Sequence, residues 1–295
     1  MAKTANLMGT GVAIVTPFTK KGHVDFDALT NLVEHLVKGG VEYLVVLGTT
    51  GESATLSKDE KQAVINHVVK VNKGRLPLVL GIGGNNTAEV VHSLKHTDLK
   101  AFSAVLSVSP YYNKPSQEGI YQHYKEVAKA SPLPVILYNV PGRTASNMSW
   151  ETTVRLAKDF KNIIAVKEAS GNLEQCMKII KYKPKEFMVI SGDDNLTLPI
   201  IACGGHGVIS VVANAFPKPF SNMVRAALKY DMPTAQKLHY SLIDITDQLF
   251  ADGNPGGVKH ALSLLKITGP TVRLPLVEPN DKVQAKLKDL VKAFK

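Results

Sequence analysis

Residues 163–168 read IIAVKE, four consecutive apolar residues followed by a lysine and a glutamate. A continuous apolar run is typical of a strand that is buried on both faces of a parallel sheet, whereas a half-exposed strand alternates. Seven similar runs follow the same pattern: Gly11–Thr16, Tyr43–Leu47, Leu76–Gly81, Ala104–Ser109, Pro134–Asn139, Phe187–Ser191 and Gly207–Val212. The sequence therefore predicts eight buried strands.

Amphipathic segments with helical spacing lie between these runs. Asp25 is a candidate N-cap before residues 26–38, Ser57 and Glu60 form a capping-box pattern, and Asn172 opens the segment after the IIAVKE run. Eight strand–helix units within residues 1–230 match an α/β fold, a closed (β/α)8 TIM barrel. A doubly wound sheet would carry fewer strands and a glycine fingerprint for nucleotides.

The pattern after Pro217 is purely helical. Apolar residues with helical spacing occupy Phe220–Leu228, Leu238–Leu249, Val258–Leu265 and Val283–Phe294, and prolines separate these segments. We predict that residues 1–230 form a catalytic barrel and that residues 231–295 form a small C-terminal helical extension.

Charge and cysteine usage narrow the class of protein. The chain has 35 Lys and Arg against 25 Asp and Glu, a net charge of +10, but the lysines are scattered rather than clustered, which argues against nucleic acid and anionic membranes as partners. Residues 195–217 carry no charge, yet Pro and Gly interrupt them, so we expect no membrane span. Two cysteines without a CxxC motif indicate a reducing, cytoplasmic compartment.

Lys167 is the sharpest chemical signal, because lysine is among the residues least often buried. The active site of a parallel barrel lies at the carboxyl ends of its strands, and Lys167 stands at such an end. A desolvated lysine amine is a nucleophile that forms a Schiff base with a carbonyl group. A structural lysine that reaches solvent or pairs with Glu168 is the alternative.

Polar residues follow other predicted strands. Thr49 and Thr50 stand in a turn between two glycines, which suits a small carboxylate or phosphate, although a plain turn explains them too. Tyr138 could move protons or simply pack. Arg143 in a Pro-Gly turn could bind a carboxylate with two hydrogen bonds or be an ordinary surface arginine.

Candidate metal ligands are weak. His92 and His96 have the spacing of a helical ligand pair, but no third ligand is evident. Asp193 and Asp194 match a helix cap better than a metal site. We predict no metal site.

Four motifs together resemble the dihydrodipicolinate synthase family, within the pyruvate-dependent class I aldolases. They are GTTGES at 48–53, PYY at 110–112, YNVPGRT at 138–144 and VKEA at 166–169, and the resemblance covers essentially the whole chain. It implies a lyase in which Lys167 forms a Schiff base with pyruvate. The derived enamine would condense with L-aspartate 4-semialdehyde to give 4-hydroxy-tetrahydrodipicolinate, on the diaminopimelate route to lysine, without metal or organic cofactor.

The resemblance also implies a role for each matching residue. Thr49, Tyr138 and Tyr112 match a proton relay in which Tyr112 reaches into the site of a neighbouring subunit. Thr50 matches a residue that holds the pyruvate carboxylate, and Arg143 one that binds the semialdehyde carboxylate. Gly192 and Ile209 match positions whose backbone carbonyls line the pocket.

Two other functions remain open. One is an N-acetylneuraminate lyase or another pyruvate-dependent aldolase, against which Arg143 in its motif argues. The other is a catalytically idle barrel that binds a keto acid.

Regulation and assembly are further expectations from the resemblance. In lysine-inhibited members an allosteric cleft uses residues that match Ser53, Ala54, Asn85, Glu89 and Tyr111. Two histidines of that cleft are replaced here by Lys58 and Lys61, whose charges would repel a lysine ammonium group, so we predict weak or absent inhibition by lysine. Ordinary solvated helix residues are the alternative. Sharing of Tyr112 implies a homo-oligomer, typically a tetramer built as a dimer of dimers.

Overall fold

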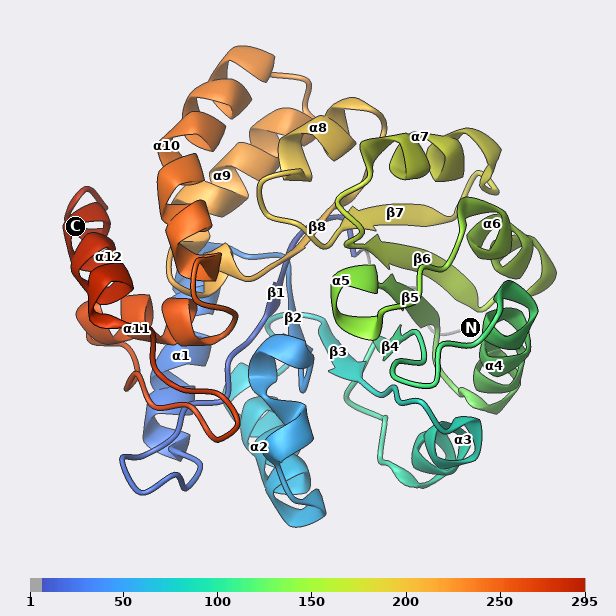
Figure 1. Cartoon of the computed structure of the whole chain (residues 1–295), viewed down its shortest axis with the longest axis horizontal. Helices are drawn as coiled ribbons and strands as arrows, with labels where there is room; N and C mark the ends of the chain where they lie inside the picture. The colour runs from blue at the N-terminus through green and yellow to red at the C-terminus, as the bar shows by residue number, and fades with distance from the viewer. Residues whose placement is uncertain (1–6, 295) are drawn as a thin grey trace. The chain divides into compact units, whose positions relative to one another are not determined.

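The computed structural model describes residues 7–294. Its eight strands follow one another in chain order around a closed parallel barrel, and helices follow the strands (Figure 1). The strands are β1 (Gly9–Ala13), β2 (Tyr43–Val46), β3 (Leu78–Gly81), β4 (Ala104–Val108), β5 (Val135–Asn139), β6 (Ile163–Glu168), β7 (Met188–Ser191) and β8 (Gly207–Ser210). All eight predicted strands are present, and the predicted (β/α)8 TIM barrel is confirmed.

The helices interleave with the strands as the sequence predicts. They are α1 (Phe26–Gly39), α2 (Lys58–Asn72), α3 (Thr87–His96), α4 (Gln117–Ala130), α5 (Pro141–Thr144), α6 (Trp150–Asp159), α7 (Leu173–Tyr182), α8 (Thr197–Ala202), α9 (Pro217–Leu228), α10 (Met232–Phe250), α11 (Gly256–Leu264) and α12 (Asp281–Lys292). Short 3-10 helices are η1 (Thr49–Gly51), η2 (Ser53–Thr55) and η3 (Val212–Asn214).

The chain divides into two compact units. Pro77–Ile209 makes up most of one unit, and Gly9–Leu76 together with Ser210–Lys295 makes up the other. The second unit therefore contains the C-terminal helices, in which α10 packs against α9 and α12. The predicted domain boundary after residue 230 stays a prediction, and residues 1–6 of the predicted barrel lie outside the described residues.

The unit built on Pro77–Ile209 fixes the register of two adjacent strands. In β5 and β6, Tyr138 lies opposite Lys167 and Asn139 lies opposite Glu168. Successive residues of a strand point to opposite faces, so Tyr138 and Lys167 share one face and Asn139 and Glu168 share the other. The residues directly before Tyr138 and Lys167, Leu137 and Val166, are fully buried, as a strand covered on both sides requires.

Local caps start the helices where the sequence predicts. The Asp25 side chain accepts the backbone N–H of Ala28 at the start of α1. At α2 the capping box is complete, with Ser57 and Glu60 each accepting the other's backbone N–H. Asn172 accepts the backbone N–H of Gln175 at the start of α7. These bonds satisfy N–H groups that a helix leaves without internal partners.

Glu60 has a second role that the sequence did not reveal. Its carboxylate forms an ion pair with Arg273, and the same guanidinium donates to the backbone carbonyls of Thr55 and Gly22. The hydrogen bonds from Arg273 lower the pKa of Glu60 to about 2. The segment around Arg273 is thereby fastened to the start of α2.

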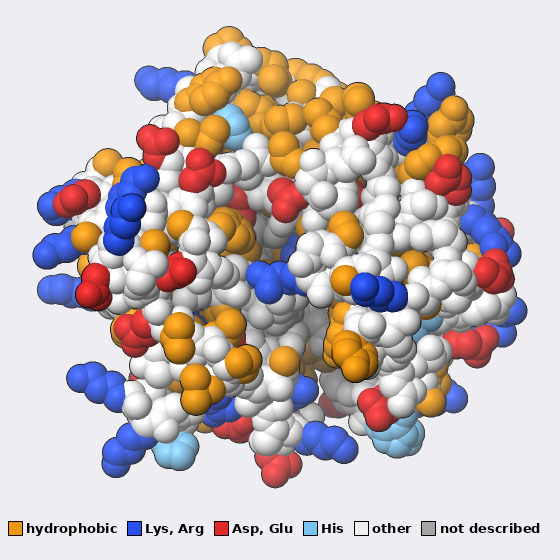
Figure 2. Space-filling model, in the orientation of Figure 1, with side chains coloured by type: hydrophobic (Ala, Val, Ile, Leu, Met, Phe, Trp, Pro, Cys, Tyr) orange, Lys and Arg blue, Asp and Glu red, His pale blue; other side chains and the backbone are white. Residues whose placement is uncertain are grey.

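The surface shows no concentration of basic groups on the visible face. Lys and Arg side chains are dispersed there among acidic ones (Figure 2). None of the helices among residues 7–294 is long and apolar enough to cross a membrane.

We expect the Glu60→Gln variant to lose stability in a pH-dependent way. Because the folded pKa lies below the ordinary value of 4.5, the contribution of the carboxylate is complete above pH 4.5 and declines as the pH falls toward 2. At pH 7 the variant should lose about 1–2 kcal/mol of unfolding free energy. Urea unfolding between pH 7 and pH 3 measures the difference in unfolding free energy between the parent and the variant. This difference should become smaller toward pH 3.

The neighbouring exposed carboxylate provides the control. Asp59→Asn removes the same charge from the same helical turn, but Asp59 forms no ion pair with Arg273. Its difference in unfolding free energy from the parent should therefore stay small at every pH. A Glu60→Gln gap that does not change with pH would contradict the assignment.

Candidate active site

Lys167 is the chemically unusual residue of the first unit. It is only 5% exposed, and its Nζ lies 4.3 Å from the centre of the Tyr138 ring. The adjacent Glu168 points to the opposite face of the strand, where it contacts Gln175 of α7. The lysine side chain therefore projects into the barrel. Within residues 7–294, no carboxylate lies within ion-pairing distance of Lys167, so the alternative of a pair with Glu168 is not observed.

Gly192, directly after β7, leaves room for this lysine. A Cβ atom at residue 192 would lie 3.0 Å from Cε of Lys167 and 2.5 Å from Cβ of Ala169. The N–H of Gly192 also donates to the carbonyl of Glu168, at 2.7 Å. A larger side chain at this position would push against the lysine.

Glu168 is buried without a cation and is held by neutral donors instead. One carboxylate oxygen accepts the backbone N–H of Ser170 at 2.9 Å, and the other accepts Nε2 of Gln175 at 2.9 Å. Nδ2 of Asn139 lies 3.1 Å from both oxygens. Burial raises the pKa of Glu168, and these hydrogen bonds oppose the rise.

Asn139 extends this amide network to the loop after α5. Its Nδ2 donates to Oδ1 of Asn147 at 2.8 Å, and its Oδ1 accepts the backbone N–H of Met148 at 2.9 Å. Nδ2 of Asn147 in turn donates to Gln175 at 2.9 Å. The segment that carries Arg143 is thus fastened to the same strand ends that carry Tyr138 and Lys167.

The structure places the remaining candidates of this unit separately. Arg143 lies exposed on α5 and makes no ion pair to another described residue. Ile209 is fully buried in β8. The contacts thus bring Lys167 together with Tyr138 and Gly192, whereas no contact joins Arg143 or Ile209 to them.

Tyr112 stands out in the loop after β4. Its side chain is 87% exposed, and its backbone has a φ of 71°, in the left-handed region that non-glycine residues seldom adopt. The next residue fixes this loop, because Nδ2 of Asn113 donates to the carbonyl of Asn85 at 2.9 Å. The expected regulatory residues Asn85 and Tyr111 thereby lie on tethered loops.

Glu89, the remaining regulatory candidate of this unit, lies exposed in the first turn of α3. No hydrogen bond or ion pair links its side chain to another described residue.

The second unit carries the other predicted site residues, on one segment after β2. Thr49 and Thr50 lie in η1, Ser53 and Ala54 in η2, and Lys58 and Lys61 in α2. Thr49 is exposed, whereas Thr50 is buried and its Oγ1 accepts a hydrogen bond from Nδ2 of Asn254 at 3.0 Å.

A buried ion pair follows directly in this segment. Glu52 pairs with Lys259 of α11, and both side chains have no exposed surface. Burial lowers the pKa of Lys259 to about 8, and the Glu52 carboxylate opposes that shift. Neither Lys259 nor Asn254 was a candidate on sequence grounds. The one available signal was a lysine in the otherwise apolar start of α11.

Two minor motifs of the sequence lie elsewhere in the structure. The helix cap assigned to Asp193 is wrong, because α8 begins only at Thr197 and the Asp193 side chain accepts the backbone N–H of Gly171 at 3.1 Å. His92 and His96 stack with their ring centres 4.0 Å apart. No group of three or more His, Cys, Asp or Glu side chains in the described part of the chain is arranged to hold a metal ion.

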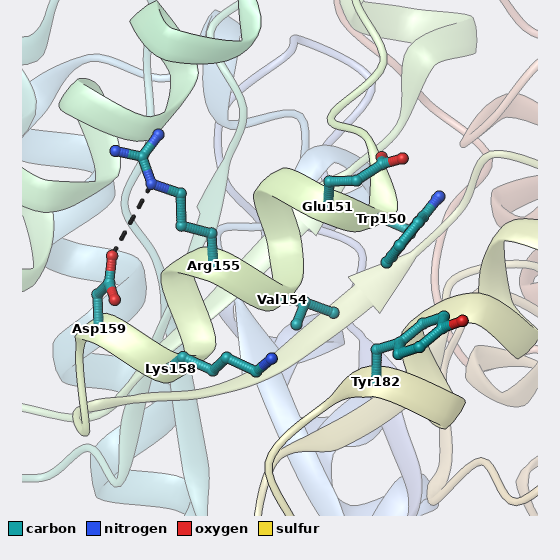
Figure 3. Close-up of a pocket in the computed structure, with 7 residues that line it drawn as sticks. All are labelled: Trp150, Glu151, Val154, Arg155, Lys158, Asp159 and Tyr182. Carbon is teal, nitrogen blue, oxygen red and sulfur yellow. Dashed lines mark ion pairs between the residues drawn. The ribbon is translucent and has the colours of Figure 1, made fainter.

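A separate hollow of about 400 Å³ lies between α6 and α7. Figure 3 shows the stacked rings of Trp150 and Tyr182 on one side and the ion pair of Arg155 with Asp159 on the other. It contains none of the predicted site residues.

A parallel barrel with a buried, unpaired lysine against a tyrosine defines a class of lyase that binds a carbonyl substrate covalently. Comparison with known proteins agrees: the model of the dihydrodipicolinate synthetase family matches residues 6–294. The chain belongs to this family.

Individual relatives are similar over nearly their whole length. The chain is 61% identical to 4-hydroxy-tetrahydrodipicolinate synthase of Flavobacterium psychrophilum over 280 residues, which are 95% of this chain and 96% of the relative. The crystal structure of dihydrodipicolinate synthase from Aquifex aeolicus is 42% identical, with a TM-score of 0.94 over 98% of each chain. A structure described as a monomeric dihydrodipicolinate synthase variant is 37% identical, with a TM-score of 0.94 over 97% of this chain and 96% of that one.

We expect Glu168→Gln to destabilise the protein although it removes a buried charge. Every neighbour of the carboxylate is a hydrogen-bond donor, so the new amide NH2 would face N–H groups and leave them unpaired. The expected loss is about 1–3 kcal/mol of unfolding free energy, measured by urea denaturation at pH 7.

The matched control is Glu174→Gln on the adjacent helix α7. This residue forms an exposed ion pair with Lys178, so the loss of unfolding free energy should be much smaller than for Glu168→Gln. Equal losses in the two variants would show that the amide network contributes nothing specific.

Proposed function

We propose that the chain catalyses the reaction named for its relatives, the synthesis of 4-hydroxy-tetrahydrodipicolinate, from pyruvate and L-aspartate 4-semialdehyde. The observation that carries the proposal is Lys167, which is buried in β6, packs against the Tyr138 ring and has no carboxylate of residues 7–294 within ion-pairing distance. In such a place a neutral amine can attack a keto group.

The chemistry follows from the amine. Nζ of Lys167 attacks the keto carbon of pyruvate, and loss of water gives an imine. The imine withdraws electrons, so the methyl carbon loses a proton and becomes an enamine, which attacks the aldehyde carbon of the semialdehyde. The amino group of the bound semialdehyde then closes the ring on the imine carbon and releases Lys167. The reaction needs no metal and no organic cofactor.

Family membership supports the assignment of the remaining roles. We assign proton transfer to Tyr138, Thr49 and Tyr112. Thr50 would hold the pyruvate carboxylate, and Arg143 the semialdehyde carboxylate. Exposure of Arg143 and its lack of an ion pair to any described residue support its role in binding an incoming anion. Gly192 and Ile209 would line the pocket with backbone carbonyls.

Sodium borohydride tests the central step. Reduction in the presence of pyruvate should leave one adduct, on Lys167, that peptide mass mapping locates, and the preparation should turn over L-aspartate 4-semialdehyde but not N-acetylneuraminate. Lys167→Ala should abolish the adduct, whereas Lys161→Ala, an exposed lysine of the same unit, should not. Pyruvate binding without an adduct would reduce the protein to a keto-acid-binding barrel.

We propose a homo-oligomer, typically a tetramer built as a dimer of dimers, in a cytoplasmic compartment. The 87% exposed side chain of Tyr112 supports this assembly, because a tyrosine with a catalytic role gains by being covered by a second subunit. One similar structure is described as a monomeric variant, so the oligomeric state differs among the relatives.

We also predict weak or absent inhibition by L-lysine, because Lys58 and Lys61 place two cations where a lysine ammonium group would bind. An assay of the purified protein with up to millimolar L-lysine measures this. The double variant Lys58→His and Lys61→His, which removes both permanent charges, should gain sensitivity. Half-inhibition of the parent protein by submillimolar L-lysine would overturn the prediction.

A further inference from the structure

Glu52 follows directly after the turn that carries Thr49 and Thr50, and it forms a buried ion pair with Lys259. The two partners are 207 positions apart in the chain, and neither side chain is exposed. Nζ of Lys259 also donates to the carbonyl of Thr271 at 2.9 Å and lies 4.1 Å from the centre of the Phe18 ring. The cation is therefore held on several sides.

Glu52 has both of its carboxylate oxygens engaged. One accepts from Lys259, and the other accepts the backbone N–H of Arg273 at 2.9 Å. The backbone of Glu52 has a φ of 51°, in the left-handed region that non-glycine residues seldom adopt. The turn that ends in this conformation also places Thr49 and Thr50, so the bonds to the Glu52 side chain hold the turn in shape.

A buried ion pair is a costly way to gain stability alone. Desolvation of both charges offsets most of their attraction, and well-packed apolar residues of similar volume are often as stable. Such a pair does fix geometry, because two donors in fixed positions hold the carboxylate in one orientation.

A second hydrogen bond connects the same turn to the segment that precedes α11. Nδ2 of Asn254 donates to Oγ1 of Thr50 at 3.0 Å, and both groups are buried. Because the Thr50 oxygen accepts this bond, its own hydroxyl hydrogen remains available to donate to an anion. Asn254 and Lys259 lie five positions apart, immediately before and within the first turn of α11.

We propose that Lys259 and Asn254 are positioning residues that set the affinity for the substrate carboxylate by fixing the Thr49–Thr50 turn. Neither touches the reacting atoms. The proposal rests on the proposed function, since it assigns the carboxylate of pyruvate to Thr50. It makes the C-terminal helical segment part of the binding machinery.

The test is the kinetic behaviour of a charge-free pair. The double variant Glu52→Gln with Lys259→Met removes both buried charges and keeps similar volumes, so it should fold with a melting temperature close to that of the parent. Its KM for pyruvate should rise roughly tenfold or more, because a displaced binding group weakens substrate binding. Its kcat at saturating pyruvate and its borohydride adduct on Lys167 should change far less.

The matched control is Glu34→Gln with Arg75→Met. That pair joins α1 to the loop that follows α2 in the same unit, and its partners are about one-third exposed. The control should keep the parental KM. Asn254→Ala, a single uncharged change, should also raise the KM for pyruvate with little effect on kcat. The single variant Lys259→Arg keeps the charge, so its KM for pyruvate should stay much closer to the parental value than the KM of the charge-free pair.

The outcomes separate the two proposals. A parent protein without an adduct and without turnover would refute the proposed function itself. An active parent whose folded double variant and Asn254→Ala variant keep the parental KM would overturn the positioning role. If the double variant does not fold, Asn254→Ala and Lys259→Arg decide the question by the same KM-against-kcat comparison.

Discussion

The burial of one lysine in a parallel strand governs the design of the first unit. Since neighbouring strand residues point to opposite faces, placing Lys167 inside the barrel places Glu168 in the layer between strand and helix. Glu168 then has to be satisfied by amides from β5 and α7, and Gly192 has to remain small. One side-chain orientation therefore dictates the chemistry of several neighbouring positions.

Two buried glutamates illustrate opposite ways of keeping a carboxylate out of water. Glu168 is surrounded by neutral N–H donors and has no cation as a partner. Glu52 takes the other route and is neutralised by Lys259. The two carboxylates are thus held in place by different partners, N–H groups in one unit and a buried cation in the other.

The sequence predicts the elements well and their long-range connections poorly. Apolar runs identify all eight strands because a strand covered on both faces has little room for polar residues, and caps such as Ser57 with Glu60 are visible because their partners are three positions apart. The pair of Glu52 and Lys259 left no local trace, because only the folded chain brings residues so distant together. The Asp193 cap was wrong because a cap has to stand directly before the first turn of a helix, and α8 begins only at Thr197.

The second unit is built from two segments that are far apart in the chain, and this affects the order in which the protein can fold. Its first part, Gly9–Leu76, is synthesised long before its second part, Ser210–Lys295, with the whole of Pro77–Ile209 in between. Pro77–Ile209 can assemble its strands as they emerge, each beside its predecessor. The ion pair of Glu52 with Lys259, in contrast, can form only when the chain is nearly complete. The turn with the threonines is therefore among the last parts to take its final form, and a chain cut short before α11 would hold an unpaired carboxylate at the place where its cation belongs.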